Sequence, residues 1–253
     1  MLQHDRYTKI KEYLIGNKAA STAALAEHLG VSTVTIRKDL DSLEQSGIVK
    51  RTHGGAMLAE GQQAAPQICA CKAIPDRMKK IAELAKNYVL PGDFVFLGSG
   101  RTCLALAECI KDIRGISIIT NNVSIVPILK PHVSNIILLG GEIIMTDDGL
   151  FTTSDANVQN AVSGMYVNKA FSSGVGIDAD IGLTVNNMLS TYITRVIPQL
   201  SEEWYVMIDS SKFGVRAFYQ AAEIGKFDHL ITDVTDENVL NKYKARGIDI
   251  IHP

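Results

Sequence analysis

Four turns in the second part of the sequence carry residues suited to holding a small anionic ligand. Each follows an apolar run: Gly98-Ser99-Gly100-Arg101-Thr102, Thr120-Asn121, Gly140-Gly141, and the turn that contains Asp209 and Lys212. Backbone N–H groups and hydroxyls in such turns can cradle a phosphate, and Arg101 and Lys212 add positive charge. One glycine turn is weak evidence, because strand-to-helix turns often need glycine for conformational reasons. Four together predict a pocket for a small phosphorylated ligand.

A second group of polar residues lies in the stretch VSTVTIRKDL, residues 31–40. Helical spacing turns Ile36, Leu40 and the later Leu43 inward. It leaves a polar face made of Ser32, Thr33, Thr35, Arg37 and Lys38. Hydroxyls bind phosphates or base edges, and an arginine can take two acceptors of guanine. These residue types predict a helix that reads DNA, helped by Lys50, Arg51 and His53 on a following wing. The alternative is a three-helix bundle with a solvated charged face.

The elements that would position this helix fill the first 56 residues. Helical spacing predicts a first helix that stops at Gly16-Asn17 and a second that begins at residue 21 or 22 and ends at Gly30. Ser32 caps the third helix, which ends at Gly47. Residues 48–51 are predicted to form a short strand and residues 53–56 the turn beyond it. Short helices joined by a tight turn at Gly30 are typical of a helix-turn-helix.

Strands and helices alternate after residue 76. Apolar runs predict strands at 94–97, 116–119, 135–139, 204–208, 229–232 and 249–251, and helices are expected at 76–88, up to 110, at 124–129 and at 236–246. This alternation is typical of a parallel sheet covered on both faces. The predicted fold class is α/β, with a small N-terminal winged helix-turn-helix joined to a larger Rossmann-like domain that has a mostly parallel sheet. The predicted domains are 1–57 and 76–253, with 58–75 as a linker.

Bulk composition excludes several protein classes. The 253 residues carry a net charge of −2, and 46% are hydrophobic, which is typical of a globular chain. Residues 1–56 carry a net charge of +2 and the remainder −4, as expected for a nucleic-acid module on a non-binding body. The four cysteines fit neither a disulfide framework nor a zinc site. No apolar run is long enough for a membrane span. We expect a cytoplasmic protein without a metal or cofactor.

A longer pattern in the N-terminal part consists of Val31-Ser32, Thr35-Ile36-Arg37-Lys38-Asp39-Leu40, Leu43-Glu44, Gly47, Arg51 and His53-Gly54-Gly55-Ala56. This pattern resembles the signature of the DeoR family of bacterial transcription regulators. The match is dense over about 25 residues and far more specific than a generic helix-turn-helix pattern. The resemblance implies a winged helix-turn-helix whose third helix lies in the major groove. It favours DNA binding over the solvated bundle.

The body also resembles that family, whose C-terminal domain looks like ribose-5-phosphate isomerase. Among the matching marks are Thr120-Asn121, Leu139-Gly140-Gly141, Gly176-Ile177-Asp178 and Asp209-Ser210-Ser211-Lys212-Phe213-Gly214. Gly98 and Asn168 stand where aspartates are common, Arg101 replaces a small hydroxyl residue, and residues 186–197 lack the usual acid and lysine. Carboxylates at such positions are the natural general bases of an isomerase, so their absence argues against catalysis. The same departures leave open that the ligand carries more negative charge than the ligands of typical members, or that its hydroxyl groups make different contacts.

The resulting hypothesis is a sensor rather than an enzyme. We expect a transcription regulator of a carbohydrate-metabolism operon. We expect it to be a repressor, because repression is the commoner mode of regulation in the family. A phosphorylated sugar or polyol in the C-terminal domain would change its binding to double-stranded operator DNA. One winged helix makes too few base contacts alone, so a dimer or higher homo-oligomer is expected. The alternatives are a sugar-phosphate isomerase-like enzyme with an appended helical domain, and a DNA-binding protein whose body only oligomerises.

Overall fold

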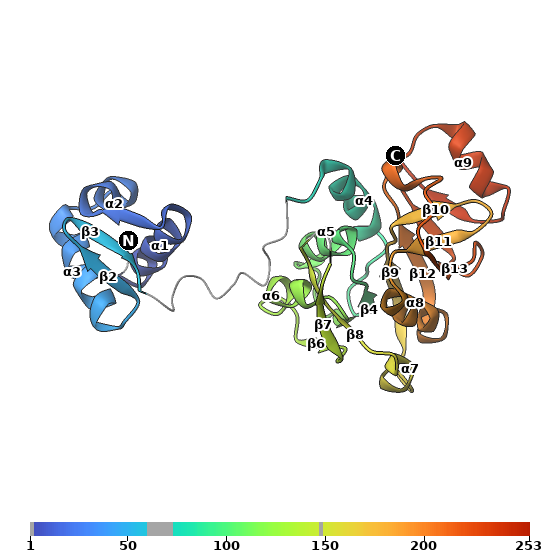
Figure 1. Ribbon diagram of the computed structural model, residues 1–253, viewed down its shortest axis with the longest axis horizontal. Coiled ribbons are helices and arrows are strands. Elements are labelled where there is room, and N and C mark those ends of the chain that lie inside the picture. The colour runs from blue at the N-terminus through green and yellow to red at the C-terminus, as the bar shows by residue number, and fades with distance from the viewer. Residues whose placement is uncertain (1–2, 60–72, 147–148) are drawn as a thin grey trace. The chain divides into compact units, whose positions relative to one another are not determined.

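The computed structural model describes residues 3–59, 73–146 and 149–253. The chain divides into two compact units, residues 1–67 (the first unit) and residues 68–253 (the second unit). The first unit contains α1 (Gln3–Asn17), β1 (Ala19–Ser21), α2 (Thr22–Leu29), α3 (Thr33–Gln45), β2 (Val49–Thr52) and β3 (Gly55–Leu58) (Figure 1). The three predicted helices are confirmed. The linker predicted for 58–75 lies mostly outside the described residues, and Leu58 itself belongs to β3.

A three-stranded antiparallel sheet completes the first unit, with β3 between β1 and β2. The predicted turn at 53–56 is too long, because Gly55 and Ala56 are already part of β3. A Cβ atom on Gly55 would lie 1.9 Å from the carbonyl oxygen of Ala20 in β1. Glycine at this position therefore lets β1 and β3 approach. The strand β1 was not predicted, since the sequence Ala-Ala-Ser has neither alternation nor β-branched side chains.

The second unit is built on a parallel sheet of seven strands in the order β15-β14-β12-β9-β4-β5-β6. The strands are β4 (Phe94–Leu97), β5 (Ser117–Thr120), β6 (Asn135–Leu138), β9 (Val167–Ser172), β12 (Ser201–Met207), β14 (His229–Ile231) and β15 (Asp249–Ile251). The predicted Rossmann-like α/β class with a mostly parallel sheet is confirmed. The central strand β9 was not among the predicted strands.

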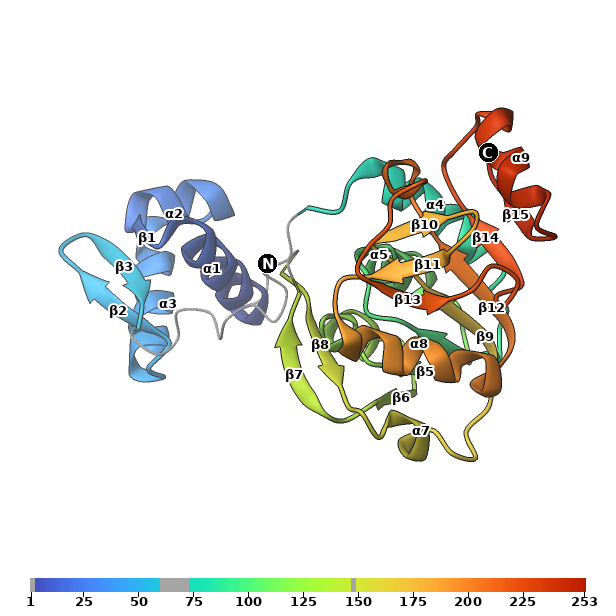
Figure 2. The ribbon, with the colours of Figure 1, turned by 45° about the vertical axis from the view of Figure 1, so that its right-hand side comes forward.

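Helices cover both faces of this sheet (Figures 1 and 2). One face carries α4 (Asp76–Lys86), α5 (Arg101–Ile110) and α6 (Val126–Leu129), and the other carries α8 (Met188–Leu200) and α9 (Glu237–Lys244). Alternate residues of β4 serve the two cores, because Val95 and Leu97 pack with α4 and α5 whereas Phe96 packs with α8. Shorter helical turns lie at α7 (Val158–Ala161), Val123–Ile125 and Ser210–Lys212.

Two antiparallel additions flank the parallel sheet, and neither was predicted. They are the hairpin of β7 (Glu142–Met145) and β8 (Phe151–Ser154), and a small sheet of β10 (Gly176–Asp178), β11 (Gly182–Val185) and β13 (Tyr219–Ala222). Both supply walls of the cavities described below. In the part of the chain that the structure describes, no helix is both long and apolar enough to cross a membrane.

Candidate DNA-binding and ligand-binding sites

The first turn of α3 is fixed by its own cap. Ser32 Oγ accepts a hydrogen bond from the backbone N of Thr35 at 3.1 Å, and the two hydroxyl oxygens lie 2.9 Å apart. The cap satisfies one of the free N–H groups at the start of the helix. Ser32 and Thr35 therefore position the helix start, while the neighbouring Thr33 is exposed.

The charged residues of α3 divide into two sets. Arg37 and Lys38 are exposed, and neither side chain has a hydrogen-bond or ion-pair partner within the described residues. Asp39 is buried, and its carboxylate receives Nε and Nη2 of Arg6 on α1 at 2.7 and 2.9 Å. The acid thus faces the inside of the unit, and the cations face outward.

The wing residues are placed differently from one another. Lys50 on β2 and His53 in the turn between β2 and β3 are exposed. Arg51 Nη1 donates to Asp41 Oδ1 of α3 at 2.6 Å, and the backbone N of Arg51 donates to Glu44 Oε1 at 2.9 Å. Arg51 therefore ties the wing to α3 and uses the two later acids of that helix. Its contact with a DNA phosphate remains a prediction.

One residue on the outer face of α3 was missed. Val34 is 59% exposed, and helical spacing places it next to Arg37 and Lys38. A valine methyl group suits contact with the C5-methyl group of thymine. An exposed apolar residue on a polar helix face of this kind is the signal in the sequence.

A cavity of about 380 Å³, here called the ligand cavity, opens beyond the carboxyl ends of the parallel strands of the second unit. Its volume lies in the range of small-molecule sites. The turns after β4, β9 and β12 and the start of α8 line it with Ser99, Gly100, Arg101, Ser173, Gly174, Lys212, Asn186, Asn187, Ser190 and Thr194. The end of β7 and the residue after it add one wall, made of Ile144, Met145 and Thr146. Four predicted residues, Ser99, Gly100, Arg101 and Lys212, meet here.

Among the described residues around the ligand cavity, positive charge exceeds negative charge. The buried Asp209 does not line it and lies behind it, where Oδ1 is 2.8 Å from Arg77 Nε and Oδ2 is 3.7 Å from Lys212 Nζ. Arg101 and Lys212 each donate to a backbone carbonyl oxygen at 2.7 Å. Arg77 and Lys212 therefore share this carboxylate, Arg101 adds a third cation, and none of the described lining side chains is acidic. This balance favours an anionic ligand.

The start of α5 contributes backbone donors to the same cavity. The first N–H groups of a helix have no acceptor inside the helix. Gly100 is the N-cap of α5 and has no side chain that could accept from them. A Cβ atom on Gly100 would lie 1.8 Å from Ser173 Oγ, so glycine lets the turns after β4 and β9 pack together. The predicted Gly98 and Thr102 are buried beside this turn and do not line the cavity.

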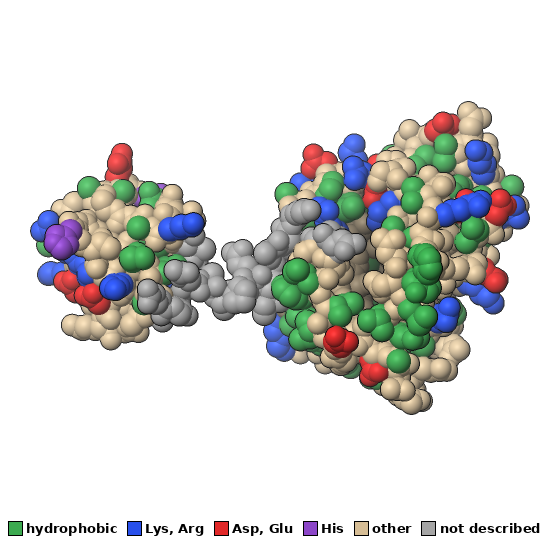
Figure 3. Space-filling view, in the orientation of Figure 1, with side chains coloured by type: hydrophobic (Ala, Val, Ile, Leu, Met, Phe, Trp, Pro, Cys, Tyr) green, Lys and Arg blue, Asp and Glu red, His purple; other side chains and the backbone are tan. Residues whose placement is uncertain are grey.

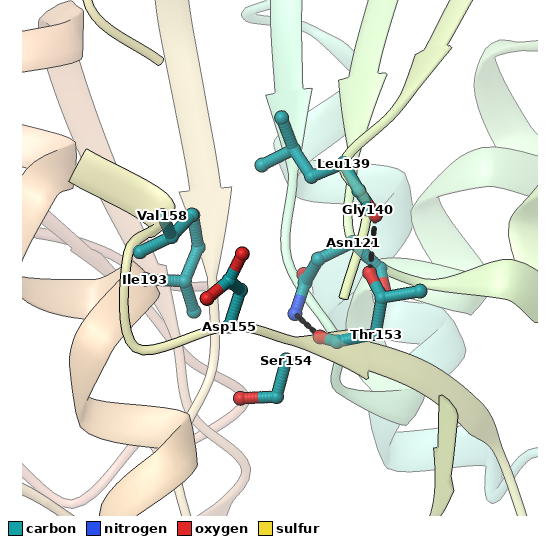
Figure 4. Close-up of a pocket in the computed structure, with 8 residues that line it drawn as sticks. All are labelled: Asn121, Leu139, Gly140, Thr153, Ser154, Asp155, Val158 and Ile193. Atoms are coloured by element: carbon teal, nitrogen blue, oxygen red, sulfur yellow. Dashed lines mark hydrogen bonds between the residues drawn. The ribbon is translucent and has the colours of Figure 1, made fainter. Parts of the chain in front are cut away.

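Four other predicted ligand residues lie outside the ligand cavity. Thr120 is buried, and its Oγ1 donates to the Leu97 carbonyl oxygen at 2.6 Å, joining β5 to β4. Asn121 and Gly140 line a second cavity of about 10 Å³, here called the small cavity (Figure 4). Gly141 forms the turn before β7 with φ of 125°, and a Cβ there would lie 2.3 Å from the Ser154 carbonyl oxygen.

The start of α8 is the largest part of the ligand cavity that sequence reasoning missed. Asn187 caps the helix, and its Oδ1 accepts from Ser190 N at 2.8 Å and from Ser190 Oγ at 2.9 Å. Asn187, Ser190 and Thr194 recur at intervals of three and four, which is the available signal for a polar face. Asn168, noted as a departure from the family, is the second residue of β9, where its Oδ1 accepts from Phe94 N at 3.0 Å. It lies at the opposite end of the strand from the cavity.

Neither thiol chemistry nor a metal cluster is evident in the described residues. Burial raises the pKa of the Cys103 thiol to about 12, so this residue on α5 stays protonated at neutral pH. Its Sγ lies 3.5 Å from the Phe171 carbonyl oxygen. Within the described ranges, no group of three or more His, Cys, Asp or Glu residues is placed to hold a metal ion.

Two family models match the two units. The model described as a DeoR-like helix-turn-helix domain matches residues 6–62. The model described as the DeoR C terminal sensor domain matches residues 75–234, which is more than half of the chain.

Curated relatives match along nearly their whole length. The HTH-type transcriptional repressor GlcR of Bacillus subtilis is 30% identical, with 92% of this chain and 89% of that protein covered. The lactose phosphotransferase system repressor of Streptococcus mutans is 29% identical, with 96% of each chain covered. Among solved structures, a D-ribose-5-phosphate isomerase in complex with phospho-erythronic acid matches with a TM-score of 0.41 and 13% identity, over 56% of this chain and 55% of the isomerase.

Proposed function

The chain belongs to the DeoR family of bacterial transcription regulators, and from this premise we propose that it represses carbohydrate-metabolism genes and responds to a phosphorylated sugar or polyol. The observation that carries the DNA-binding half is the arrangement of charge on α3. Arg37 and Lys38 point outward without partners among the described residues, while Asp39 is buried against Arg6. The first unit therefore presents a cationic helix face.

The proposed DNA complex places the start of α3 in the major groove. Arg37 reads guanine, Val34 contacts a thymine methyl group, and Lys38 binds phosphate. Lys50 and His53 on the wing bind the adjacent backbone. The Arg51–Asp41 ion pair supports this arrangement because it holds the wing against α3.

The proposed effector occupies the ligand cavity with its phosphate at the start of α5. Ser99, Gly100 and Arg101 offer a hydroxyl, backbone N–H groups and a guanidinium there. The sugar or polyol part reaches Asn187, Ser190 and the other polar groups of α8. Amides and hydroxyls both donate and accept hydrogen bonds, so they suit sugar hydroxyls in either role.

We propose binding without turnover. The described residues that line the ligand cavity include no Asp, Glu or His that could move a proton between sugar carbons. Cys103 nearby is a protonated thiol, because burial raises its pKa. The isomerase alternative therefore finds no carboxylate or imidazole base among the described residues of this lining.

We also propose that the repressor acts as a dimer or higher homo-oligomer. β6 is an edge strand of the seven-stranded sheet, and among the described strands it pairs with β5 alone. Hydrophobic side chains gather on one face of the second unit (Figure 3), and Ile137, Leu138, Ile143 and Met145 on β6 and β7 are exposed. An uncovered apolar edge of this kind favours pairing with another chain.

Two measurements test the proposal. Selection from random double-stranded DNA should yield a specific operator. Binding to it should weaken steeply with salt, because Lys and Arg side chains that bind phosphates release the counterions condensed on the DNA. A melting-temperature screen should find a phosphorylated sugar or polyol that stabilises the protein, and its unphosphorylated form should not. Isomerisation of that compound by the protein would contradict the proposal that it binds without turnover.

A further inference from the structure

The small cavity is built around an amide oxygen that lacks a partner. Asn121 is 6% exposed, and its Oδ1 accepts no hydrogen bond from the described residues. The orientation of the amide is settled by its other end, since Nδ2 donates to the Thr153 carbonyl oxygen at 3.2 Å. A flipped amide would set two acceptor oxygens against each other at that contact. The unpartnered oxygen therefore belongs to the cavity side.

A carboxylate lines the same space. Asp155 lies across the small cavity from Asn121 (Figure 4). Its Oδ1 accepts from the backbone N of Asn157 at 2.8 Å, and it forms no ion pair with any Lys, Arg or His among the described residues. An ionised carboxylate accepts hydrogen bonds and donates none. Asp155 therefore brings a second acceptor and a negative charge that no described side chain balances.

The described residues of the lining offer no side-chain donor for these oxygens. Thr153 Oγ1 donates to the Leu139 carbonyl oxygen at 2.5 Å, and Ser154 Oγ donates to the Leu189 carbonyl oxygen at 3.2 Å. The remaining side chains of the lining are apolar. Two acceptor oxygens and one negative charge thus border a space of about 10 Å³, which is the size of one bound atom.

We propose that the small cavity binds one monovalent metal cation, Na⁺ or K⁺, between Asn121 Oδ1 and the Asp155 carboxylate. Carbonyl and carboxylate oxygens are the ligands that hard cations prefer. A single carboxylate balances a single positive charge, whereas divalent cations generally take more carboxylates. A water molecule could donate to both oxygens, but it would leave the charge of Asp155 unbalanced.

The bound cation would join parts of the second unit that are distant in sequence. Asn121 follows β5, Asp155 follows β8, and Ile193 of α8 closes the same cavity. Ser190 and Thr194 of that helix line the ligand cavity. Cation binding therefore stabilises the second unit, whichever effector the ligand cavity takes.

The test is the melting temperature of the full chain in NaCl or KCl, compared with N-methyl-D-glucamine chloride at equal ionic strength. Above the dissociation constant, each tenfold rise in cation concentration should raise the melting temperature by about 3–5 °C. Asp155→Asn should fold and lose this response, because its new amide nitrogen can donate to Asn121 Oδ1. Asp112→Asn removes one exposed carboxylate elsewhere and should keep the response.

Crystals of the wild-type chain grown with Rb⁺ or Tl⁺ test whether a cation occupies the small cavity, even if a variant fails to fold. An anomalous peak between Asn121 and Asp155 supports the proposal. An ordered water there without anomalous signal overturns it. An equal cation response of the wild-type chain and Asp155→Asn overturns it as well.

Discussion

Replacing Arg37 by alanine separates base reading from phosphate binding on α3. The side chain is exposed and has no partner among the described residues, so its truncation leaves no buried group unpaired. The free energy of unfolding should therefore change by less than about 0.5 kcal/mol. If the guanidinium takes two guanine acceptors, the variant loses about 1–3 kcal/mol of discrimination. The ratio of operator affinity to random-DNA affinity then falls roughly 5- to 160-fold.

Fluorescence anisotropy titrations of the selected operator and a scrambled duplex, repeated over a range of salt, measure this ratio and its salt slope. Lys38→Ala is the matched control, because Lys38 is exposed on the same helix and is proposed to bind phosphate. Its salt slope should fall by about 0.9 with the affinity ratio unchanged. An Arg37→Ala variant that behaves in the same way would refute base reading by Arg37. A large fall in its unfolding free energy would assign Arg37 to the fold.

Three further predictions concern the wing, the ligand cavity and pH. Gly55→Ala should destabilise the first unit by about 1–3 kcal/mol in urea, because its Cβ would lie 1.9 Å from a β1 carbonyl oxygen; Gly54→Ala, where nothing lies within 4 Å, should not. Lys212→Ala should keep operator affinity and lose the effector's stabilising shift in melting temperature, and loss of DNA binding would assign Lys212 to the fold. Hydrogen bonds from Arg216 hold the pKa of Asp178 below its usual value. The resulting stability is complete above the unfolded pKa of about 3.9 and is lost as pH falls through the lower folded pKa; Asp178→Asn should flatten that part of a melting-temperature profile.

Most strands of the parallel sheet were predictable because each is a short, nearly unbroken apolar run. The central strand β9 was not predicted, because its sequence is not such a run. Its sequence, Val167-Asn-Lys-Ala-Phe-Ser172, places Asn168 and Lys169 inside a strand that is central in the sheet. Lys169 is 3.4 Å from Asp93 and Asn168 accepts from Phe94 N, so both polar side chains are satisfied by residues 74 or more positions away. Local sequence carries no information about such distant partners.

The candidate sites were predictable to the extent that their chemistry is local. The Ser32 cap and the outward cations of α3 follow from helical spacing. The inward pairing of Asp39 depends on Arg6, which is 33 residues earlier, and could not be predicted. Thr120 shows the same limit in the second unit. Its hydroxyl donates to the Leu97 carbonyl oxygen of the next strand, and a turn sequence does not say whether a hydroxyl faces a ligand or a neighbouring strand.

The most direct test of effector-controlled repression is a measurement of operator affinity with and without the effector that the melting screen identifies. A ligand can shift DNA binding only if it binds the free and DNA-bound forms unequally. A saturating phosphorylated sugar or polyol should weaken operator binding at least about tenfold, which is about 1.4 kcal/mol of coupling. Lys212→Ala should remove the effect. Unchanged operator affinity with every phosphorylated compound that stabilises the protein would contradict effector-controlled repression.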